Sequence, residues 1–401
     1  MTASLRLAEQ GYEVYLIERE KELGGNVRGA FYTLKGSQPQ AFLQDLIRQV
    51  QSSAFIRPFI GAEVVDFERK DGHYRTKVRH QGEEKVLDHG ALILATGGKE
   101  VSPKGYLYGE DPRVITQRQL ENMIHLDGEE LKDVCSVVMI QCVGSRDEEH
   151  PYCSRICCNH AVKNALRLKA KNPGMNLYVL YRDVRTYGFY ETFYHEARGK
   201  GVIFVRYDLE NRPEVVARDG RLQVSLFDPA LGSRVTLPAD RVVLSTGVEP
   251  NDNRELARIF GVELNPDGFF MEANPKSAPL DSVDRGKFFC GLCHSPNFIE
   301  DAISQGNAAA ARAAALLSKD ATEEKAQLAY VVKRLCCGCG LCVTVCPYQA
   351  RALNEEESKA EVDRSLCQGC GNCVVACRNA ASQQVNFEKG LNLAVLDAAI
   401  D

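Results

Sequence analysis

The feature that most constrains the fold of this chain is a cysteine pattern that occurs twice near its end. The two copies are Cys336-x2-Cys339-x2-Cys342-x3-Cys346-Pro347 and Cys367-x2-Cys370-x2-Cys373-x3-Cys377. This spacing wraps three thiolates around one face of an iron–sulfur cubane, and the fourth cysteine of each run ligates the other cluster. The pattern therefore predicts a small α+β domain over residues 328–390 that binds two 4Fe–4S clusters, as tandem ferredoxin domains do.

The crossing of the fourth cysteines divides these residues into two ligand sets. Cluster one takes Cys336, Cys339, Cys342 and Cys377, and cluster two takes Cys367, Cys370, Cys373 and Cys346. A zinc ribbon is the alternative, and eight cysteines in a doubled pattern argue against it. The chain departs from the pattern twice, because Arg378 replaces the usual proline and Cys337 adds a thiol beside a ligand.

Composition limits the class of protein further. Sixteen cysteines in a sequence that opens without a recognisable signal peptide indicate metal centres rather than disulfides. The formal net charge of −5 gives no reason to expect nucleic acid or an anionic membrane as a partner. No apolar run reaches the roughly 18 residues of a membrane span, so we expect a cytoplasmic protein without a direct membrane span.

The first residues match the second half of a dinucleotide-binding βαβ unit. We expect a helix over Thr2–Gln10 and a strand over Glu13–Ile17, followed by Glu18, where an acidic side chain binds ribose hydroxyls. Gly24 and Gly25 come next, and paired glycines let the backbone approach a dinucleotide closely. This spacing favours a flavin site over the alternative, an ordinary αβ hairpin of a doubly wound sheet.

A buried strand that ends in a Thr-Gly turn occurs twice. The turns contain Thr96, Gly97 and Gly98 in the first copy and Thr246 and Gly247 in the second. In flavoproteins with two dinucleotide-binding domains such a turn abuts the cofactor. A simple strand-ending turn is the alternative, and the presence of a second copy argues against it.

A third candidate flavin contact follows the second turn along the chain. A strand at Phe288–Cys290 leads through Gly291 into an alanine-rich helix over Phe298–Leu317, with Gln305 in its second turn. A helix N-terminus at this place carries partial positive charge and would favour a reduced anionic flavin ring. A well-packed core helix explains the alanines equally well.

A second α/β unit lies between the two Thr-Gly turns, with an expected strand at Val137–Gln141, a helix at Ser154–Ala170 and a strand at Asn176–Tyr181. A pyridine-nucleotide site needs glycines directly after the first strand, so that helix amides can hold a pyrophosphate. Cysteines occupy this position instead, which argues against a nicotinamide site.

These cysteines are Cys142, Cys153, Cys157 and Cys158. We expect Cys153 and Cys157 to share one helix face at i and i+4, with Cys142 approaching from the strand end. Four converging thiolates can hold a third 4Fe–4S cluster, and a zinc site or reduced structural thiols fit the spacing equally well.

Lys163 is the candidate catalytic residue. It lies further along the same helix, rotated away from the cysteines, so that it can face a flavin and stabilise charge on reduction; an ordinary surface lysine is the alternative. His160 can substitute as a ligand, although a solvated or capping histidine is the simpler interpretation. Cys290 and Cys293 are either a redox dithiol or bystander thiols, and we favour bystanders.

The stretch Gln141–Lys169, QCVGSRDEEHPYCSRICCNHAVKNALRLK, resembles the A subunit of heterodisulfide reductase and its bacterial relatives. The likeness continues through VLYRDVRTYGFYE, VVLSTGVEPN and FFCGLCHSPNFIEDAISQGNAAAARAAALLSKD. The resemblance implies an α/β, thioredoxin-reductase-like FAD domain with two Rossmann-type halves. It also implies that a 4Fe–4S cluster on Cys142, Cys153, Cys157 and Cys158 replaces the nicotinamide site.

Family members act as the flavin electron hub of larger complexes, and some are proposed to bifurcate electrons between a heterodisulfide branch and ferredoxin. The resemblance therefore implies an oxidoreductase subunit that passes electrons between FAD and three 4Fe–4S clusters. Its implied partners are other subunits of a heterodisulfide reductase-like complex, with ferredoxin, hydrogenase or dehydrogenase subunits as electron donors. A subunit of a quinone-interacting membrane-bound oxidoreductase, a scaffold without FAD, and a reductase that uses Cys290 and Cys293 are the alternatives.

The expected domains follow from this resemblance. Residues 1–130 form the first part of the FAD-binding domain, 131–240 the second Rossmann-like half, and 241–320 the last part of the FAD-binding domain. Ser318–Gln327 is the expected linker to the cluster domain. Family members carry a strand and a G-x-G-x-x-G turn before the segment that matches Met1–Ser4, so we expect a truncated or miscalled start and weak FAD binding unless a partner chain supplies the strand.

Overall fold

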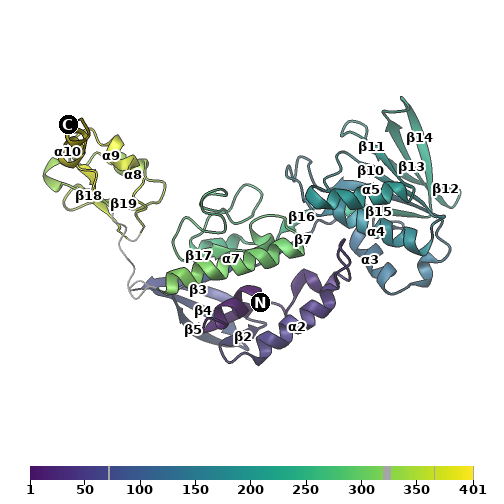
Figure 1. The fold of residues 1–401 in the computed structure, drawn as a ribbon, viewed down its shortest axis with the longest axis horizontal. Coiled ribbons are helices and arrows are strands. Elements are labelled where there is room, and N and C mark those ends of the chain that lie inside the picture. Colours follow the sequence, from purple (N-terminus) through teal and green to yellow (C-terminus); the bar gives the residue numbers. More distant parts are fainter. Residues whose placement is uncertain (71–72, 319–326, 365, 401) are drawn as a thin grey trace. The chain divides into compact units, whose positions relative to one another are not determined.

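The computed structural model describes residues 1–70, 73–318, 327–364 and 366–400, and it divides into two compact units (Figure 1). Unit one comprises Met1–Met271 and Phe288–Arg312, and unit two comprises Glu272–Lys287 and Ala313–Asp401. The predicted linker Ser318–Gln327 falls largely on residues 319–326, which lie outside the described residues.

The first part of unit one surrounds the short helix at the start of the chain. Its elements are α1 (Thr2–Ala8), β1 (Val14–Glu18), η1 (Gly25–Gly29), α2 (Pro39–Ser52), β2 (Ile56–Ile60), β3 (Glu63–Lys70), β4 (His73–His80) and β5 (Glu83–His89). Strands β1 and β2 pair in parallel, whereas β3, β4 and β5 form an antiparallel sheet. Leu5, Val50 and Ile56 form the centre of a small core beneath the parallel pair.

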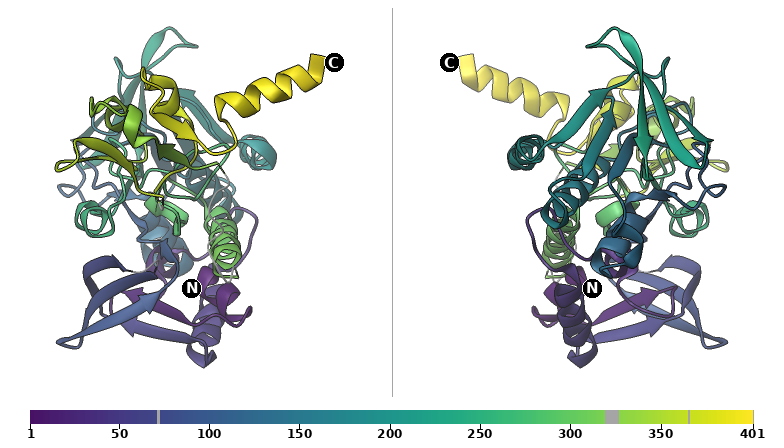
Figure 2. Two further views of the ribbon diagram at one scale, coloured as in Figure 1. Left: turned by 90° about the vertical axis from the view of Figure 1, so that its left-hand side faces the viewer. Right: turned by 90° about the vertical axis from the view of Figure 1, so that its right-hand side faces the viewer.

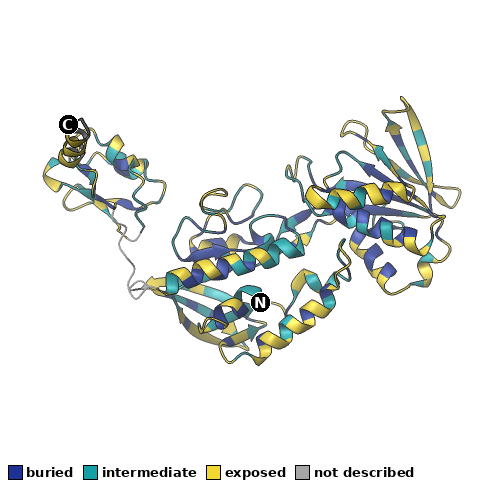
Figure 3. Cartoon of the chain, viewed as in Figure 1, coloured by how far each residue is buried: buried dark blue, intermediate teal, exposed yellow. Residues whose placement is uncertain are grey.

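A five-stranded parallel sheet forms the second half of unit one, in the order β11-β10-β9-β15-β8. The strands are β8 (Val114–Thr116), β9 (Ser136–Val143), β10 (Asn176–Tyr181), β11 (Val202–Arg206) and β15 (Arg241–Thr246). Figure 3 colours its central strands as largely buried, and β9 and β15 are almost completely so. The sheet includes β8 and β15, which lie before and after residues 131–240 in the sequence.

Helices cover one face of this sheet, and a small antiparallel sheet covers the other. The covering elements are α3 (Gln117–His125), α4 (Cys157–Lys171), α5 (Glu191–Gly199), β12 (Glu214–Arg218), β13 (Arg221–Asp228) and β14 (Ser233–Ala239). Alternate residues of β9 point to opposite faces, so that Met139 packs with the helices while Ile140 packs with β13. The sheet is therefore buried on both faces, as parallel sheets usually are.

A two-stranded ribbon joins the parts of unit one, where β7 (Gly98–Glu100) pairs with β16 (Val248–Pro250). A Cβ atom on Gly98 would lie 2.7 Å from the backbone oxygen of Glu249, and one on Gly247 would lie 2.1 Å from the backbone oxygen of Gly144. Close approach of the backbone therefore requires glycine in both Thr-Gly turns.

Several elements of the first part of unit one come from later positions in the chain. They are β6 (Leu92–Leu94), α6 (Arg254–Phe260), β17 (Lys287–Phe289), η4 (Gly291–Cys293) and α7 (Ile299–Leu317). A Cβ atom on Gly306 of α7 would lie 3.3 Å from the Cβ atom of Thr2, so α7 packs closely against α1. This contact favours a small residue at position 306. None of the helices in the described residues is long and apolar enough to cross a membrane.

Unit two contains two similar halves that contribute to one small fold. Its elements are β18 (Ala329–Val331), η5 (Lys333–Leu335), α8 (Leu341–Thr344), β19 (Arg351–Asn354), β20 (Lys359–Val362), α9 (Asn372–Ala376), β21 (Ser382–Gln384) and α10 (Lys389–Ile400). Strand β18 pairs with β21 and β19 pairs with β20, both antiparallel. Helix α10 leads to the C-terminus in both views of Figure 2.

Candidate iron–sulfur and flavin sites

The cysteine loop, residues 144–156, connects β9 to α4 and differs from the prediction. Helix α4 begins at Cys157 rather than at Ser154, so Cys153 lies in the loop and does not share a helix face with Cys157. The reason is local: Arg155 has φ of +60°, which no helix accommodates. The hydroxyl of Ser154 also accepts a hydrogen bond from the N–H of Val248 at 2.8 Å, which holds the chain in a non-helical path.

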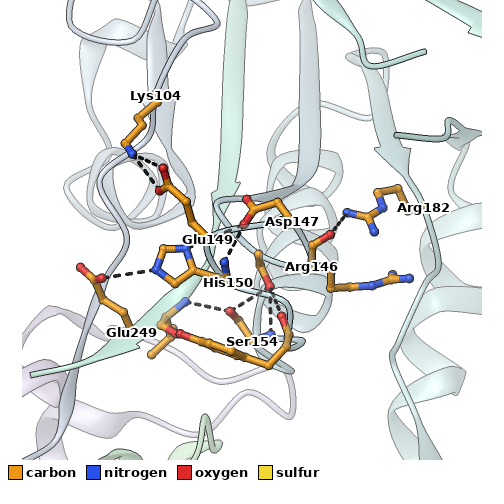
Figure 4. Close-up of polar contacts among 11 residues, drawn as sticks. Lys104, Arg146, Asp147, Glu149, His150, Ser154, Arg182 and Glu249 are labelled. Atoms are coloured by element: carbon orange, nitrogen blue, oxygen red, sulfur yellow. Dashed lines mark hydrogen bonds and ion pairs between the residues drawn. The ribbon is translucent and has the colours of Figure 1, made fainter. Parts of the chain in front are cut away.

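Hydrogen bonds and ion pairs hold the cysteine loop in place on several sides (Figure 4). Lys104 binds both carboxylate oxygens of Glu149 at 2.8 Å, and Nε2 of His150 lies 3.5 Å from a carboxylate oxygen of Glu249. Nη1 of Arg182 donates to the backbone oxygen of Arg146 at 2.8 Å. These contacts give a loop without regular secondary structure a defined path.

The four thiols of Cys142, Cys153, Cys157 and Cys158 lie close enough to interact electrostatically. Burial, reinforced by Cys158, raises the pKa of Cys142 to about 11. The hydrogen bond to Cys158, together with burial, raises the pKa of Cys157, and the same bond lowers the pKa of Cys158 to about 7. Cys142 has φ of +60°, a strained conformation that turns the strand end toward the other thiols.

Arginine side chains surround these thiols. Nη2 of Arg146 pairs with Asp183 at 2.8 Å, while its Nη1 is buried without a hydrogen-bond partner in the part of the chain that the structure describes. Arg146 and Arg182 act electrostatically on Cys142, and Arg185 hydrogen-bonds Cys153. A 4Fe–4S cluster with four thiolate ligands is anionic, so both the sulfur donors and the cations around them fit such a cluster.

The spacing of the thiols bears on the kind of metal centre they could form. Among the described residues, no three His, Cys, Asp or Glu side chains have a geometry that would hold one metal ion. A cubane gives each thiolate its own iron atom, so the ligands of a cluster stand further apart than the ligands of a single ion.

Lys163 is not a surface lysine. Its ammonium lies 2.7 Å from Glu121 and donates to the backbone oxygen of Tyr32 at 2.8 Å, and its side chain is only 12% exposed. His160 is a partner of the same carboxylate rather than a helix cap, because its Nε2 lies 2.7 Å from the same oxygen of Glu121, and its side chain is 23% exposed. The prediction missed Glu121, which lies on α3 in no recognisable motif and is separated from both partners by about forty residues of sequence.

A chain of buried hydrogen bonds runs from this ion cluster to the end of β9. Tyr32 donates to Asn164 at 2.8 Å, and Asn164 donates to the side chain of Gln117 at 2.8 Å. Both Gln117 and Gln141 then donate to the hydroxyl of Ser245, at 3.0 and 2.8 Å. Because Gln141 directly precedes the first cysteine, the network fixes the position from which the cysteine loop departs.

The predicted ribose contact, Glu18, ends β1 at the carboxyl edge of the parallel β1–β2 pair, where open α/β sheets bind ligands. Its carboxylate accepts the N–H of Glu20 at 2.9 Å. Gly24 and Gly25 follow with φ of +120° and +49°, and the first value is open to glycine alone. An acidic side chain beside a glycine-dependent loop fits the ribose end of a dinucleotide.

The other predicted flavin residues lie in polar loops. The side chain of Asn251 donates to the backbone oxygen of Thr96 at 2.6 Å, and Gly97 has φ of +77°. The hydroxyl of Thr246 donates to Glu100. Their contact with a flavin stays a prediction.

The loop before α7 is tied to both α7 and the cysteine loop. Gln305 accepts the N–H of Gly291 at 2.8 Å, so these two predicted flavin residues contact each other. Nη1 of Arg155 donates to the side chain of Asn297 at 3.0 Å, and its Nη2 donates to the hydroxyl of Tyr187 at 2.8 Å. Arg155 thereby connects the cysteine loop to the start of α7.

Cys290 and Cys293 are buried, which disfavours a redox role. The thiol of Cys293 donates to the backbone oxygen of Leu94 at 3.1 Å, and burial raises its pKa far above the ordinary range. Burial also raises the pKa of Cys290 to about 11. Neither thiol is activated as a nucleophile, as a reactive dithiol requires.

Each ligand set predicted for the doubled cysteine run lines one cavity of unit two. The first cavity, of about 210 Å³, is lined by all four cysteines of cluster one, Cys336, Cys339, Cys342 and Cys377. The second, much smaller at about 10 Å³, is lined by all four cysteines of cluster two, Cys346, Cys367, Cys370 and Cys373. In each set, three cysteines come from one run and one from the other, as the crossing rule requires.

The sequence of unit two also matches a known domain. Residues 329–378 match the family model of a 4Fe-4S dicluster domain.

Longer matches cover most of the chain. It is 35% identical to a protein of Archaeoglobus profundus named for its likeness to the A subunit of heterodisulfide reductase, and 38% identical to an iron–sulfur A subunit of CoB–CoM heterodisulfide reductase from Methanopyrus kandleri, each over 69% of this chain. A third relative, the A subunit of ferredoxin:CoB–CoM heterodisulfide reductase from Methanosarcina mazei, is 35% identical over 84% of this chain. The chain is related to the A subunit of heterodisulfide reductase. It spans 43–44% of the length of these relatives.

Solved structures identify the fold of unit one. Thioredoxin reductase of T. acidophilum matches with a TM-score of 0.53, and that of Lactococcus lactis with 0.54. The matches cover 79% of this chain and 93–94% of those chains, at 15–16% sequence identity. The predicted fold class, a thioredoxin-reductase-like domain with a dicluster domain, is confirmed.

Proposed function

We propose that this chain is an electron-transfer subunit of a heterodisulfide reductase-like oxidoreductase, with FAD and three 4Fe–4S clusters as its redox groups. The observation that carries the proposal is the convergence of the Cys142, Cys153, Cys157 and Cys158 thiols at the β9–α4 junction. In dinucleotide-binding folds this junction holds the phosphates of a nicotinamide cofactor. Cysteines in place of that glycine loop favour an iron–sulfur centre as the partner of the flavin.

The protein's own residues define three cluster sites and one flavin site in this proposal. Cys142, Cys153, Cys157 and Cys158 hold one cluster, and the two cavities of unit two hold the others. Glu18, Gly24 and Gly25 bind the ribose end of FAD. When bound, a flavin exchanges both single electrons and pairs, whereas each cluster exchanges single electrons.

Lys163 and Glu121 have a defined role beside the flavin in this scheme. A buried ammonium stabilises negative charge that develops on a nearby group, and Glu121 holds this ammonium in place at 2.7 Å. We further propose that the flavin can divide an electron pair between two acceptors, which is electron bifurcation.

Partners follow from the same scheme. The relatives are named as subunits, which supports assembly with other subunits, and one name includes ferredoxin, which supports ferredoxin as an electron donor. Hydrogenase or dehydrogenase proteins as electron donors are a finer part of the proposal. All sixteen cysteines are free thiols, which supports a reducing, cytoplasmic location. The burial of Cys290 and Cys293 disfavours the alternative of a self-sufficient disulfide reductase.

Anaerobic reconstitution with iron, sulfide and FAD tests the proposal. We expect about twelve iron atoms per chain, four for each of three clusters. We also expect FAD in equal amount. About eight iron atoms and no flavin would contradict an electron-transfer subunit with FAD and would favour a scaffold. Activity confined to membranes, with quinone as acceptor, would favour the quinone-interacting alternative.

A further inference from the structure

The two cysteine runs of unit two repeat each other with an offset of 31 residues, which relates Cys336 to Cys367 and Arg351 to Ser382. The backbone follows this repeat. Gln349 and its equivalent Ala380 both have positive φ, at +50° and +51°. Two cluster sites built from one repeated segment would have nearly equal surroundings. Arg351 breaks this similarity, because the equivalent position in the second repeat is a serine, Ser382.

Arg351 is a buried cation, with only 5% of its surface exposed, at the first residue of β19. Its Nη2 donates to the sulfur of Cys373 at 2.9 Å and to the hydroxyl of its repeat equivalent, Ser382, at 2.5 Å. Its Nη1 is buried and has no hydrogen-bond partner among the described residues. A buried guanidinium in this state is costly unless an anion lies beside it.

The position of Arg351 makes its effect on the two clusters unequal. It lines the cavity of cluster two and hydrogen-bonds Cys373, a ligand of that cluster. It acts on the cluster-one ligands Cys336 and Cys342 through its charge alone. Cluster one instead receives backbone N–H bonds at 3.4 Å to its sulfurs, from Ala360 and Ser382. Lys359 also acts on Cys336 by its charge, and it hydrogen-bonds the backbone oxygen of that residue rather than a ligand sulfur.

Hydrogen bonds to ligand sulfur and nearby positive charge both stabilise the reduced, more negative state of a cluster. We infer that Arg351 is a potential-setting residue, which raises the reduction potential of cluster two relative to cluster one and so biases the resting place of an electron in unit two. This inference rests on the proposed function, because it requires both clusters to be present. A single side chain thereby favours electron transfer from cluster one to cluster two, although the two cluster sites come from repeated segments.

Three variants of the reconstituted full-length chain test the inference. Arg351→Met removes the charge and the donor while keeping similar volume, and Arg351→Lys keeps a charge. Arg334→Met is the matched control, because Arg334 is exposed and two residues from a cluster-one ligand. EPR-monitored redox titration gives the midpoint potential of each cluster, and iron analysis counts the clusters.

In Arg351→Met we expect the equilibrium constant for moving an electron from cluster one to cluster two to fall about tenfold, or about 59 mV for a one-electron couple. Arg351→Lys should recover most of the difference, and Arg334→Met should match the wild type. Unchanged potentials in Arg351→Met, or an equal shift in Arg334→Met, would overturn the inference.

Iron content separates the remaining outcomes. Loss of iron from unit two in both Arg351 variants would make the residue structural and overturn its potential-setting role. Loss in Arg351→Met with full iron in Arg351→Lys would support the need for a cation beside the cluster. A wild-type chain without the two clusters would contradict the proposed function instead.

Discussion

Replacing Glu121 with glutamine removes the anion that two buried side chains share. The carboxylate accepts from His160 and Lys163, both at 2.7 Å, and from the N–H of Phe31 at 2.8 Å. Glutamine keeps the shape of the side chain but removes its charge. The variant therefore leaves the ammonium of Lys163 in a buried site without its counter-ion.

Two estimates give the size of the effect. Burial by itself raises the pKa of Glu121, but the hydrogen bond and charge of His160 and the charge of Lys163 outweigh it and lower this pKa from 4.5 to about 2. At 1.36 kcal/mol per pKa unit, this difference corresponds to about 3 kcal/mol. Removal of one partner from a buried ion pair typically costs about 3–5 kcal/mol, which agrees.

Amide hydrogen exchange in α4 measures this cost locally, without assuming that the two units unfold together. A loss of about 3 kcal/mol corresponds to roughly a hundredfold faster exchange of the α4 amides in Glu121→Gln. Glu129→Gln is the matched control, because that side chain is 84% exposed. Glu129→Gln should change the exchange rate of the α4 amides by less than about twofold, because substitutions on the surface usually have small effects.

The pH dependence gives a second check. Glu121 has a folded pKa below its ordinary value, so its contribution is fully present above pH 4.5 and is lost as the pH falls through 2. Burial keeps the pKa of His160 below its ordinary value of 6.5, so neither Glu121 nor His160 changes charge between pH 7 and pH 8. The difference between wild type and Glu121→Gln should therefore be equal at pH 7 and pH 8. A difference below about threefold at pH 7, or one that disappears by pH 8, would refute the argument.

Two further substitutions test the packing of unit one. Gly247→Ala would place a Cβ atom 2.1 Å from the backbone oxygen of Gly144, so it should lower the free energy of unfolding by about 1–3 kcal/mol, measured as a lower Tm by calorimetry. Gly199→Ala is the control in α5, where the new Cβ atom meets open space, and it should raise the free energy of unfolding by about 0.5–1 kcal/mol. Arg155→Ala removes the bond to Asn297 and should speed amide exchange at the start of α7 about tenfold, and a wild-type rate there would contradict the link.

The cluster-two and cluster-one ligand sets were predictable because short cysteine spacing limits the backbone to one way of surrounding a cubane. Each set lines one cavity of unit two, and the assignment of these cysteines as cluster ligands stays a prediction. The α/β fold class was predictable for a similar reason, since buried strands and their turns have short-range signatures.

Residues that depend on strain or on distant contacts could not be predicted. The positive φ of Arg155, which removes Cys153 from the helix, accompanies one hydrogen bond from the N–H of Val248 to the hydroxyl of Ser154, ninety-four residues away. Glu121 has no motif, and only the packing of α3 against α4 brings it to Lys163. The sheet that β15 joins could not be predicted, because a buried strand looks the same in sequence whichever sheet it joins.

The central claim, a third cluster on the cysteine loop, is tested most directly by the iron content of Cys157→Ser. Cys157 is buried among the four thiols, whereas Cys135 is an exposed thiol in none of the ligand sets, so Cys135→Ser is the matched control. The account predicts that Cys157→Ser loses about four iron atoms, one cluster, while the control keeps about twelve. Equal iron in both variants, with both clusters of unit two intact, would contradict it.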